Sequence, residues 1–401
     1  MFVRISNPSR TRSLEQAVRI LAITFLVSLT IPVNPVVARY VSSDSAPGAN
    51  QALCLPGQLE QFNNSDCANL GPVGRLAELE AMGITFPAEP LPIVPTPADL
   101  GVIPFAYAIV SNENVPLYSS PENAQANNPG NSLPASNIKY VSLYQKVKTD
   151  QGTYYQIATY EWISGEYIKK VSVPTFRGFE LRYNPDNAFG WVLETVSPRS
   201  SPAINAPPVN KTYYRYNVLP IYASQTIGDE EWVMVGVNEW LQKRYIARVL
   251  PGYTPPAGVS GDRWIEINLQ EQVLTVYDSG KLVFATLISS GSPPFYTQPG
   301  VFQVYKMLVN DRMSGAFEAD RSDYYYLEDV PYILYYDNLR ALHGAYWNNY
   351  LGYRGSHGCV NLSVADAHWL YDWAREGDYV YVWDPTGKTP TDPALYGAGG
   401  F

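Results

Sequence analysis

The sequence of 401 residues predicts a mainly β protein built from several domains. Short runs of alternating apolar and polar residues, rich in Tyr, Val and Ile, are separated by Gly, Pro and Asn turn signals, as is typical of short strands. Breaks rich in proline at residues 87–97, 200–208 and 251–261 divide the chain. The clearest helical pattern begins at Ser363, with an acidic residue three positions later, and ends at Gly377.

The first 38 residues have the pattern of a secretory signal peptide. Four arginines precede an apolar core at residues 20–31, and residues 36–38 (Val-Val-Ala) form a small-residue cleavage site. The apolar run is closed by Pro32 and is shorter than the roughly 20 residues that span a bilayer as a helix. We therefore expect a secreted or extracytoplasmic protein of the cell wall or envelope. An uncleaved membrane anchor is the alternative.

Charge and cysteine content narrow the functional classes. The formal net charge of −9 becomes −12 once the predicted leader, with its four arginines and one glutamate, is removed. This acidic balance argues against nucleic acid as a partner. The segment 39–100 holds Cys54 and Cys67, which we expect to form a disulfide outside the cytoplasm. Two reduced cysteines are the alternative, but a disulfide would leave Cys359 as the single free thiol.

Between the first and third breaks, the chain contains an imperfect internal repeat. Residues 115–120 (VPLYSS) match 219–224 (LPIYAS), and residues 161–163 (EWI) match 239–241 (EWL). The members of these pairs are 104 and 78 positions apart, so we expect extra residues in the first copy, at 124–137.

The two copies, residues 101–199 and 209–250, resemble bacterial SH3-like β-barrels, which often bind cell wall beside wall-modifying enzymes. Their aromatic residues could form a groove for a sugar or peptide, or they could pack the core of so small a barrel. The sequence does not decide between these, and we predict no binding residue in either unit.

Residues 261–384 form the last predicted domain. Residues 273–277 and 282–289 flank an Asp-Ser-Gly hairpin signal, which predicts two paired strands. The predicted helix follows late in this domain, and residues 379–383 then have the composition of a returning strand. From residue 385 to 401, Gly, Pro and Thr dominate without apolar periodicity, so we expect a disordered tail.

Two of the three histidines and one of the three cysteines lie within 17 residues, at His343, His357 and Cys359. A thiol with a pKa of about 8.5 needs a base to take its proton, and either imidazole could do so. Gly358 lets the chain turn sharply and present the N–H groups of Gly358 and Cys359 to the oxyanion that attack on a carbonyl creates. The pattern therefore predicts acyl transfer through Cys359.

Four further residues are candidates for support or for substrate binding. Ser356 and Asn361 are small polar residues beside the turn, suited to fix its backbone, and Asn361 is also a candidate substrate contact. Arg354 could pair with a substrate carboxylate or be a solvated surface residue. Tyr346 belongs to a group of tyrosines around His343 that could wall a cleft and limit water, or could simply pack the sheet.

Residues 356–361 (SHGCVN), preceded by His343-Gly344, resemble the catalytic motif of the L,D-transpeptidases. That motif is a histidine followed some dozen residues later by Ser or Thr, then His-Gly-Cys, a hydrophobic residue and Asn or Arg. The resemblance extends to residues 330–336 and to 297–302 (TQPGVF), which is similar to the family's Thr-Pro-x-Gly-x-Phe turn with small departures. It covers residues 261–384 and implies a β-sandwich with a short helix.

The resemblance also implies a reaction. Cys359 would attack the carbonyl between the third residue of a peptidoglycan stem tetrapeptide and its terminal D-Ala, and an amine on a neighbouring stem would resolve the thioester. His343 matches the general base, the backbone carbonyl of Gly344 would orient its imidazole, and His357 would have an auxiliary role. Donor and acceptor stem peptides are the expected partners, and carbapenems are the expected covalent inhibitors. No metal or organic cofactor is expected.

Other interpretations of the same residues remain open. Cys359 could be an inert structural cysteine, or a zinc ligand together with His343 and His357, although no fourth ligand is evident. In papain-like peptidases the cysteine ordinarily precedes its histidine, the reverse of the order here. A wall-binding protein with an inactive catalytic domain is one functional alternative. A carboxypeptidase that hydrolyses the same acyl-enzyme is the other.

Overall fold

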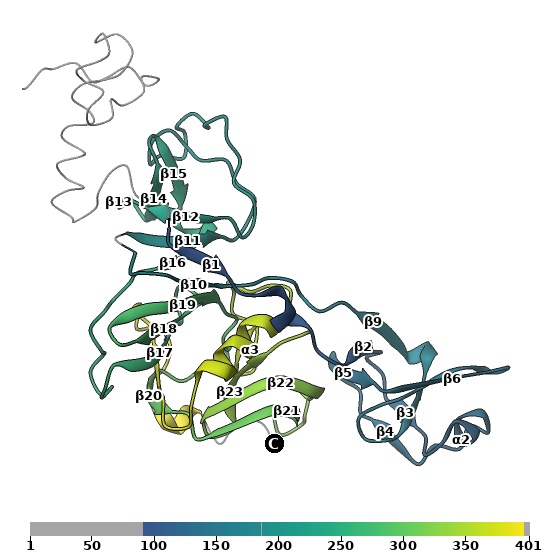
Figure 1. Cartoon of the computed structure of the whole chain (residues 1–401). Helices are drawn as coiled ribbons and strands as arrows, with labels where there is room; N and C mark the ends of the chain where they lie inside the picture. The colour runs from purple at the N-terminus through teal and green to yellow at the C-terminus, as the bar shows by residue number, and fades with distance from the viewer. Residues whose placement is uncertain (1–90, 186, 397–401) are drawn as a thin grey trace, which may run out of the picture. The chain divides into compact units, whose positions relative to one another are not determined.

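A computed structural model of the protein describes residues 91–185 and 187–396. The predicted signal peptide and the predicted disulfide between Cys54 and Cys67 lie outside these residues. The described chain is mainly strand, as the sequence predicts, and forms two small units and a C-terminal domain (Figure 1). No helix in this part of the chain is both long and apolar enough to cross a bilayer.

The two small units share one order of elements, except that unit 1 has two short strands and a short helix inserted after its first strand. Unit 1 consists of β2 (Ala106–Val110), β3 (Val115–Leu117), α2 (Pro121–Gln125), β4 (Asn131–Leu133), β5 (Ile138–Leu143), β6 (Gln145–Thr149), β7 (Gly152–Gln156), β8 (Trp162–Ser164), the 3₁₀ helix η2 (Gly165–Tyr167) and β9 (Ile168–Val171). Unit 2 consists of β11 (Ala188–Val192), β12 (Val218–Ile221), β13 (Ala223–Ile227), β14 (Glu230–Gly236), β15 (Glu239–Gln242), the 3₁₀ helix η3 (Lys243–Tyr245) and β16 (Ile246–Val249). Strands β6 and β13 begin at residues 145 and 223, and β9 and β16 at 168 and 246, so the counterparts stay 78 residues apart.

This constant separation supports an internal repeat and changes its alignment. Trp162 in β8 and Trp240 in β15 are equivalent, as predicted. Residues 115–120 instead lie in β3 and the turn after it, whereas 219–224 lie in β12 and β13, the counterparts of β5 and β6. Unit 2 also begins at residue 188 rather than 209, because β11 pairs with both β12 and β16.

The C-terminal domain contains strands from two seven-stranded sheets. Its elements are β17 (Arg263–Asn268), β18 (Val273–Asp278), β19 (Lys281–Leu287), β20 (Gly300–Gln303), β21 (Lys306–Gly315), β22 (Tyr325–Asp337), β23 (Arg340–Gly344), β24 (Val360–Leu362), α3 (Val364–Trp373) and β25 (Tyr379–Trp383). Three linker elements precede it: β1 (Ile93–Pro95), the 3₁₀ helix η1 (Ala98–Gly101) and β10 (Phe179–Leu181). One sheet has the order β1-β10-β19-β18-β17-β25-β20. The other has the order β24-β23-β22-β5-β2-β9, with β21 paired to β22.

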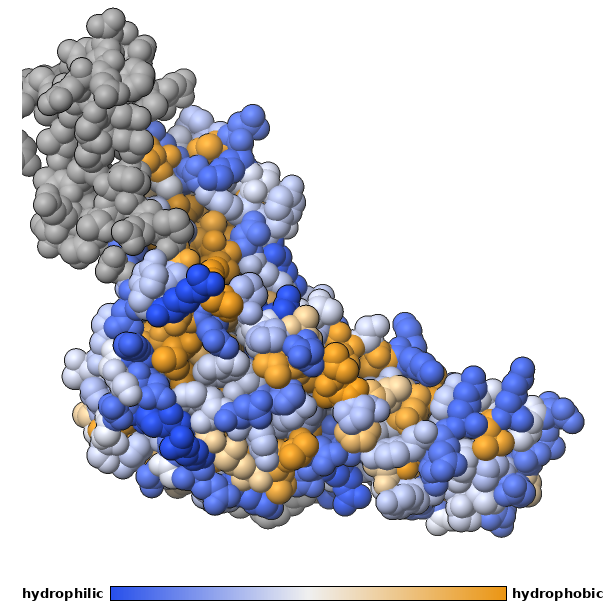
Figure 2. Space-filling model, viewed as in Figure 1, coloured by the Kyte–Doolittle hydropathy of each residue, from blue (hydrophilic) through white to orange (hydrophobic). Residues whose placement is uncertain are grey.

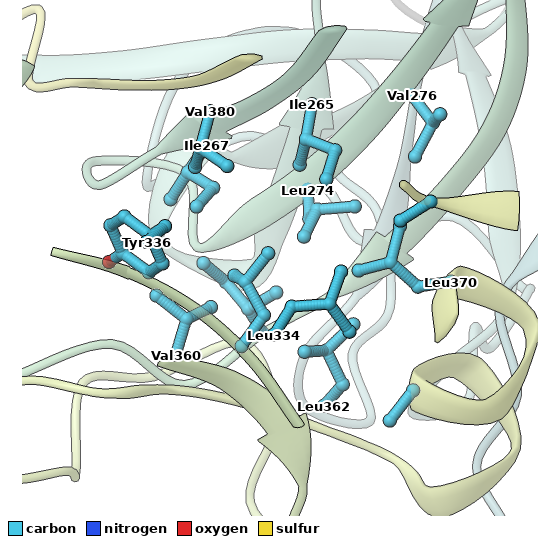
Figure 3. Close-up of a cluster of buried hydrophobic side chains, with 14 of the residues drawn as sticks. Ile265, Ile267, Leu274, Val276, Leu334, Tyr336, Val360, Leu362, Leu370 and Val380 are labelled. Atoms are coloured by element: carbon cyan, nitrogen blue, oxygen red, sulfur yellow. The ribbon is translucent and has the colours of Figure 1, made fainter. Parts of the chain in front are cut away.

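The β18–β19 hairpin confirms the predicted turn. Ser279 and Gly280 both have positive φ, 53° and 71°, as a two-residue turn between twisted strands requires. Apolar side chains of β17, β18 and β25 then pack against those of β22, β23 and β24, which gives the β-sandwich that the resemblance implies (Figure 3). The labelled members of this core are Ile265, Ile267, Leu274, Val276, Leu334, Tyr336, Val360, Leu362, Leu370 and Val380.

Helix α3 confirms the predicted helix and covers one side of this core. The Oγ of Ser363 accepts a hydrogen bond from the backbone N–H of Asp366 at 3.1 Å, the expected N-cap contact. Leu370 and Ala367 point into the core. The helix ends at Trp373, four residues before Gly377, because Ala374 is already extended (φ −71°, ψ 161°).

The chain after β25 remains ordered up to residue 396, which differs from the predicted disordered tail. A short 3₁₀ helix, η4 (Pro393–Leu395), precedes Tyr396. Tyr396 is 6% exposed, and the guanidinium of Arg340 lies 5.2 Å from its ring centroid. A single buried aromatic ring at the end of a Gly- and Pro-rich segment thus anchors residues that have no apolar periodicity.

One face of the described surface is mainly polar. Figure 2 shows hydrophilic residues over much of the viewed face, with hydrophobic residues in separate patches between them. Some of the largest apolar side chains, including Trp191 and Trp264, are fully buried.

Candidate active site

Two parallel strands bring the predicted catalytic residues together. β23 pairs with β24 so that Leu342 lies opposite Val360 and His343 opposite Asn361. Successive side chains of a strand point to opposite faces. Leu342 and Val360 therefore face the core, whereas His343, Asn361 and Cys359, one residue before β24, line a cavity. The strand register thus delivers the thiol and the imidazole to the same space.

His343 is a buried, neutral imidazole. The residue is 2% exposed, and its ring lies beside that of Trp347, with 5.6 Å between ring centroids. Its Nδ1 is 3.4 Å from the backbone carbonyl oxygen of Gly344. A carbonyl oxygen can only accept, so Nδ1 carries the proton and Nε2 keeps a free lone pair. Burial lowers the pKa of His343 to about 4, and the Gly344 carbonyl opposes this shift.

Cys359 is the only free cysteine among residues 91–185 and 187–396, and it is partly exposed. The protein packed around its thiol raises the thiol pKa, while the backbone N–H of Ala341 and the charge of Arg340 lower it. Because the pKa of His343 is about 4 and that of a free thiol about 8.5, transferring the proton at rest would cost more than about 6 kcal/mol. The resting pair is therefore neutral.

Ser356 fixes the turn that carries the nucleophile. Its Oγ accepts a hydrogen bond from the N–H of Gly358 at 3.2 Å and donates one to the carbonyl oxygen of Cys359. Gly358 has φ +111°, a conformation that other residues adopt only with strain. Since Ser356 engages the Gly358 N–H, that group does not face an incoming carbonyl here, which differs from the predicted oxyanion role. The Cys359 N–H is the remaining backbone candidate of this turn.

Thr297, in the turn that resembles Thr-Pro-x-Gly-x-Phe, supports the turn that carries Cys359. Its hydroxyl donates to the carbonyl oxygen of Gly358 and accepts from the N–H of Gly291, both at 2.8 Å. Thr297 is fully buried, so these two contacts complete the needs of its hydroxyl. The sequence marked this residue through the resemblance, and the structure gives its physical role.

His357 lies in an aromatic cluster at the cavity wall. Its ring centroid is 4.7 Å from that of Phe295, 5.6 Å from Tyr325 and 6.1 Å from Phe317. Burial lowers its pKa, and the charge of Asp323 opposes this. This packing supports the predicted auxiliary role. Within the described ranges, no group of three or more His, Cys, Asp or Glu side chains is arranged to hold a metal ion.

Of the predicted substrate contacts, only Asn361 lines the cavity. Arg354 does not, because its guanidinium is used elsewhere. It donates to Thr389 Oγ1 at 3.1 Å and lies 3.6 Å from the carboxylate of Asp384, which is itself nearly buried. Arg354 therefore holds the chain after β25 in place, and the structure gives no basis for its pairing with a substrate carboxylate.

Tyr346 is a core residue rather than a wall of the cavity. It is fully buried, and its ring stacks on that of Tyr107 with 3.5 Å between centroids. Its hydroxyl donates to the backbone carbonyl of Glu328 at 2.8 Å. The alternative that the sequence left open, packing of the sheet by tyrosines, holds for this residue. Tyr325, from the same tyrosine-rich region, does line the cavity.

Other cavity residues had no sequence signal. Arg340 begins β23 and lines the cavity, although strict alternation puts it out of phase with His343. Ile138 belongs to β5 of unit 1 and reaches the cavity because β5 pairs in parallel with β22, with Ile138 opposite Tyr325. A contact between residues so far apart along the chain leaves no local pattern.

Comparison with known proteins gives a consistent result. The model of the YkuD L,D-transpeptidase catalytic domain matches residues 262–382. The chain is 27% identical over 173 residues to L,D-transpeptidase 1 of Mycobacterium tuberculosis, which covers 39% of this chain and 67% of that protein. It is 31% identical over 127 residues to L,D-transpeptidase 2 of the same species, covering 29% of this chain and 30% of that protein.

Solved structures of L,D-transpeptidases also match this part of the chain. A crystal structure of an Enterococcus faecium L,D-transpeptidase mutant is 28% identical, with a TM-score of 0.28, and covers 31% of this chain and 50% of that one. The NMR structure of the E. faecium catalytic domain is 30% identical, with a TM-score of 0.28, and covers 31% of this chain and 100% of that one. The family match thus confirms the predicted resemblance for residues 262–382, which form a domain of the L,D-transpeptidase catalytic type.

Proposed function

We propose that the protein is a peptidoglycan L,D-transpeptidase with Cys359 as nucleophile and His343 as general base. The observation that carries this proposal is the placement of a thiol and a neutral imidazole at one cavity by two parallel strands. In the first step, Cys359 Sγ attacks the carbonyl carbon between the third stem residue and D-Ala while its proton moves to His343 Nε2. The C–N bond then breaks, D-Ala leaves as an amine with that proton, and a thioester remains.

In the second step, an amine of another stem peptide attacks the thioester. The amine loses a proton to His343, the C–S bond breaks, and the thiol of Cys359 is restored as the new amide leaves. The cavity walls are largely apolar and aromatic, which limits water and favours an amine over hydrolysis. These wall residues are Ile138, Met313, Phe317, Tyr325, Leu327, Leu339 and Trp347.

The oxyanion formed in each step needs donors at the same cavity. Besides the Cys359 N–H, Tyr325 is suited to this role, because burial and the nearby Cys359 charge both raise the pKa of its hydroxyl. The phenol therefore stays protonated and can donate a hydrogen bond at physiological pH.

The same proposal extends to the rest of the chain. Both small units repeat a strand order that ends in strand, 3₁₀ helix and strand, which supports an SH3-like barrel for each. The leader would direct the enzyme to the cell wall or envelope, where its stem-peptide substrates lie. Trp232 and Trp240 of unit 2 are buried, so we assign wall binding to neither.

Mass spectrometry of the full mature chain tests the reaction. The protein is incubated with a tetrapeptide donor, with and without an amine acceptor, and the peptide that contains Cys359 is analysed. We expect a mass gain equal to the donor minus D-Ala, which clears faster when the amine is present. Cys359→Ala should abolish the adduct, and His343→Ala should slow its formation at least about 100-fold.

The third histidine provides the matched control. His368 stacks on Tyr332 with 4.0 Å between ring centroids and its Nδ1 lies 3.0 Å from the carbonyl oxygen of Leu100, so His368→Ala should leave the adduct intact. A carbapenem adduct on Cys359 would give independent support. Adduct formation in folded Cys359→Ala would overturn the proposal, and release of only the hydrolysed tripeptide would indicate a carboxypeptidase.

A further inference from the structure

Arg340 is a buried cation at the wall of the candidate active site. It is 3% exposed, begins β23 and lies three residues before His343. Among the described residues that line the cavity with Cys359, it is the only lysine or arginine. A buried arginine costs free energy unless other groups hold it and use its charge. Its partners therefore indicate what it does.

Two hydrogen-bonded contacts hold the guanidinium of Arg340 in place. Nη1 lies 3.1 Å from Oδ2 of Asp337, and Nη2 donates to the backbone carbonyl of Tyr396. The Tyr396 ring also covers the guanidinium, with 5.2 Å from its centroid to Cζ. Arg340 is thus fixed by β22 and by the chain segment that follows β25.

The third nitrogen faces the nucleophile turn. Nε of Arg340 is buried and has no hydrogen-bond partner. A Cβ on Gly358 would lie only 3.1 Å from it, so the guanidinium packs directly against the residue before Cys359. A side chain at 358 would displace either the turn or Arg340. The pair therefore defines the position of the thiol.

Arg340 also supplies a positive charge that no other residue lining the described cavity provides. His343 is neutral at rest, and burial raises the pKa of the Cys359 thiol, so a negative sulfur needs a positive charge nearby. Of the charged groups near the thiol, Asp337 raises its pKa and Arg340 lowers it. Four phenols near the thiol have raised pKa values and stay neutral: Tyr305, Tyr325, Tyr335 and Tyr336. His357, at the cavity wall, has a pKa lowered by burial.

We propose that Arg340 is a positioning residue that seats the Gly358–Cys359 turn and compensates the charge of the sulfur, and that the segment ending at Tyr396 keeps it in place. The C-terminal segment then controls thiol reactivity although it does not line the cavity. This inference rests on the proposed nucleophilic role of Cys359. It deepens that role by naming the group that offsets the sulfur charge.

Alkylation by iodoacetamide tests the charge. The rate is measured on the full mature chain from pH 5 to pH 11 and read on the Cys359 peptide by mass spectrometry. Arg340→Met should shift the midpoint of the pH profile upward by at least one unit, and alkylation at pH 7.5 should slow at least tenfold. Arg340→Lys keeps a positive charge and should slow it less than threefold.

Two truncations test the segment. A chain that ends at Ala398 keeps both contacts to Arg340, with the Tyr396 carbonyl still in a peptide bond, so its pH profile should match that of the full chain. A chain that ends at Pro390 loses them and should shift in the same direction as Arg340→Met. Because the shortened chain keeps Arg340, a loss of its position rather than of its charge would be the cause.

The alkylation assay tests this inference separately from the proposed function, because iodoacetamide reacts with the thiol without any peptidoglycan substrate. Near-ultraviolet circular dichroism identifies any variant that fails to fold. If Arg340→Met fails to fold, Arg340→Lys still tests the role of the charge, and the two truncations still test the role of the segment. Equal pH profiles for the chains ending at 390 and 398 would overturn the role of the segment. Equal profiles for Arg340→Met and the wild type would overturn the role of the charge.

Discussion

Replacing Glu328 with glutamine should stabilise the protein at pH 8 and leave its stability nearly unchanged at pH 4.5. Glu328 lies in β22 and is fully buried. Its carboxyl group accepts hydrogen bonds from the hydroxyl of Tyr326 at 2.8 Å, and from the N–H groups of Ser142 and Ala158 at 3.0 and 3.1 Å. The last two belong to unit 1, so this one side chain joins unit 1 to β22.

The magnitude follows from the pKa. Burial raises the pKa of Glu328 to about 7, against the opposing effect of its three donors. An unfolded glutamate has a pKa of about 4.3, so between these values the folded state holds a proton that the unfolded state has released. Stability is therefore full below about pH 4.3 and falls as pH rises toward 7. The difference of about 2.7 between these two pKa values corresponds to a loss of about 3.7 kcal/mol.

Glutamine is the matched neutral side chain. Its amide oxygen can accept from Ser142 and Ala158, and its NH₂ group can donate to the Tyr326 hydroxyl, so the geometry survives. Urea unfolding followed by tryptophan fluorescence at pH 4.5 and pH 8 gives the free energies for both proteins. Burial also raises the pKa of Asp366 to about 6, which adds a similar pH dependence to the stability of both proteins. Subtracting the free energy of unfolding of one protein from that of the other removes this contribution.

We expect Glu328→Gln to be more stable than the wild type at pH 8 by up to about 3 kcal/mol, and similar to it at pH 4.5. A difference of the same size at both pH values would refute the reasoning. It would mean that the three donors keep the carboxylate charged in the folded protein, so that burial does not dominate its pKa.

Three further predictions concern the nucleophile turn and its base. Gly358→Ala places a side chain at φ +111° and 3.1 Å from Arg340, so it should cost about 1–3 kcal/mol in unfolding and slow acyl-adduct formation at least tenfold by mass spectrometry. Thr297→Val leaves the Gly358 carbonyl and the Gly291 N–H without a partner and should cost about 2 kcal/mol or more, whereas Thr297→Ser should restore most of it. Because burial lowers the pKa of His343 to about 4, the acylation rate should show no acidic limb near pH 6.5 and should fall only near pH 4. A limb near pH 6.5 in the wild type would contradict a buried, neutral base.

The sequence predicted those parts of the fold that local chemistry determines. The hairpin at Ser279 and Gly280 follows from turn chemistry, and the helix after Ser363 follows from its N-cap. His343 and Cys359 were predicted from the reactivity of a thiol and an imidazole and from the resemblance. Their position on one face follows from the alternation of side chains along β23 and β24 together with the register in which these two strands pair.

The parts that sequence could not predict depend on distant contacts. Arg354 and Tyr346 are residue types that often bind ligands. Here Arg354 pairs with Asp384 and Tyr346 stacks on Tyr107, and neither partner is near in sequence. The alignment of the internal repeat was shifted because similar residues recur in different elements of the two units. The segment after β25 has no apolar periodicity, so the sequence could not predict that Tyr396 is buried against Arg340.

The pairing of β5 with β22 changes what unit 1 does for the reaction. Tyr325 and Leu327 of β22 line the cavity, and in the pairing with β5 they lie opposite Ile138 and Tyr140. Ile138 itself lines the cavity, so unit 1 supplies part of the cavity wall. Because an exposed strand edge admits water and other chains, removing this cover would open the site. Under the proposed function, we expect the choice between an amine acceptor and water to depend on a domain that carries none of the proposed reacting groups.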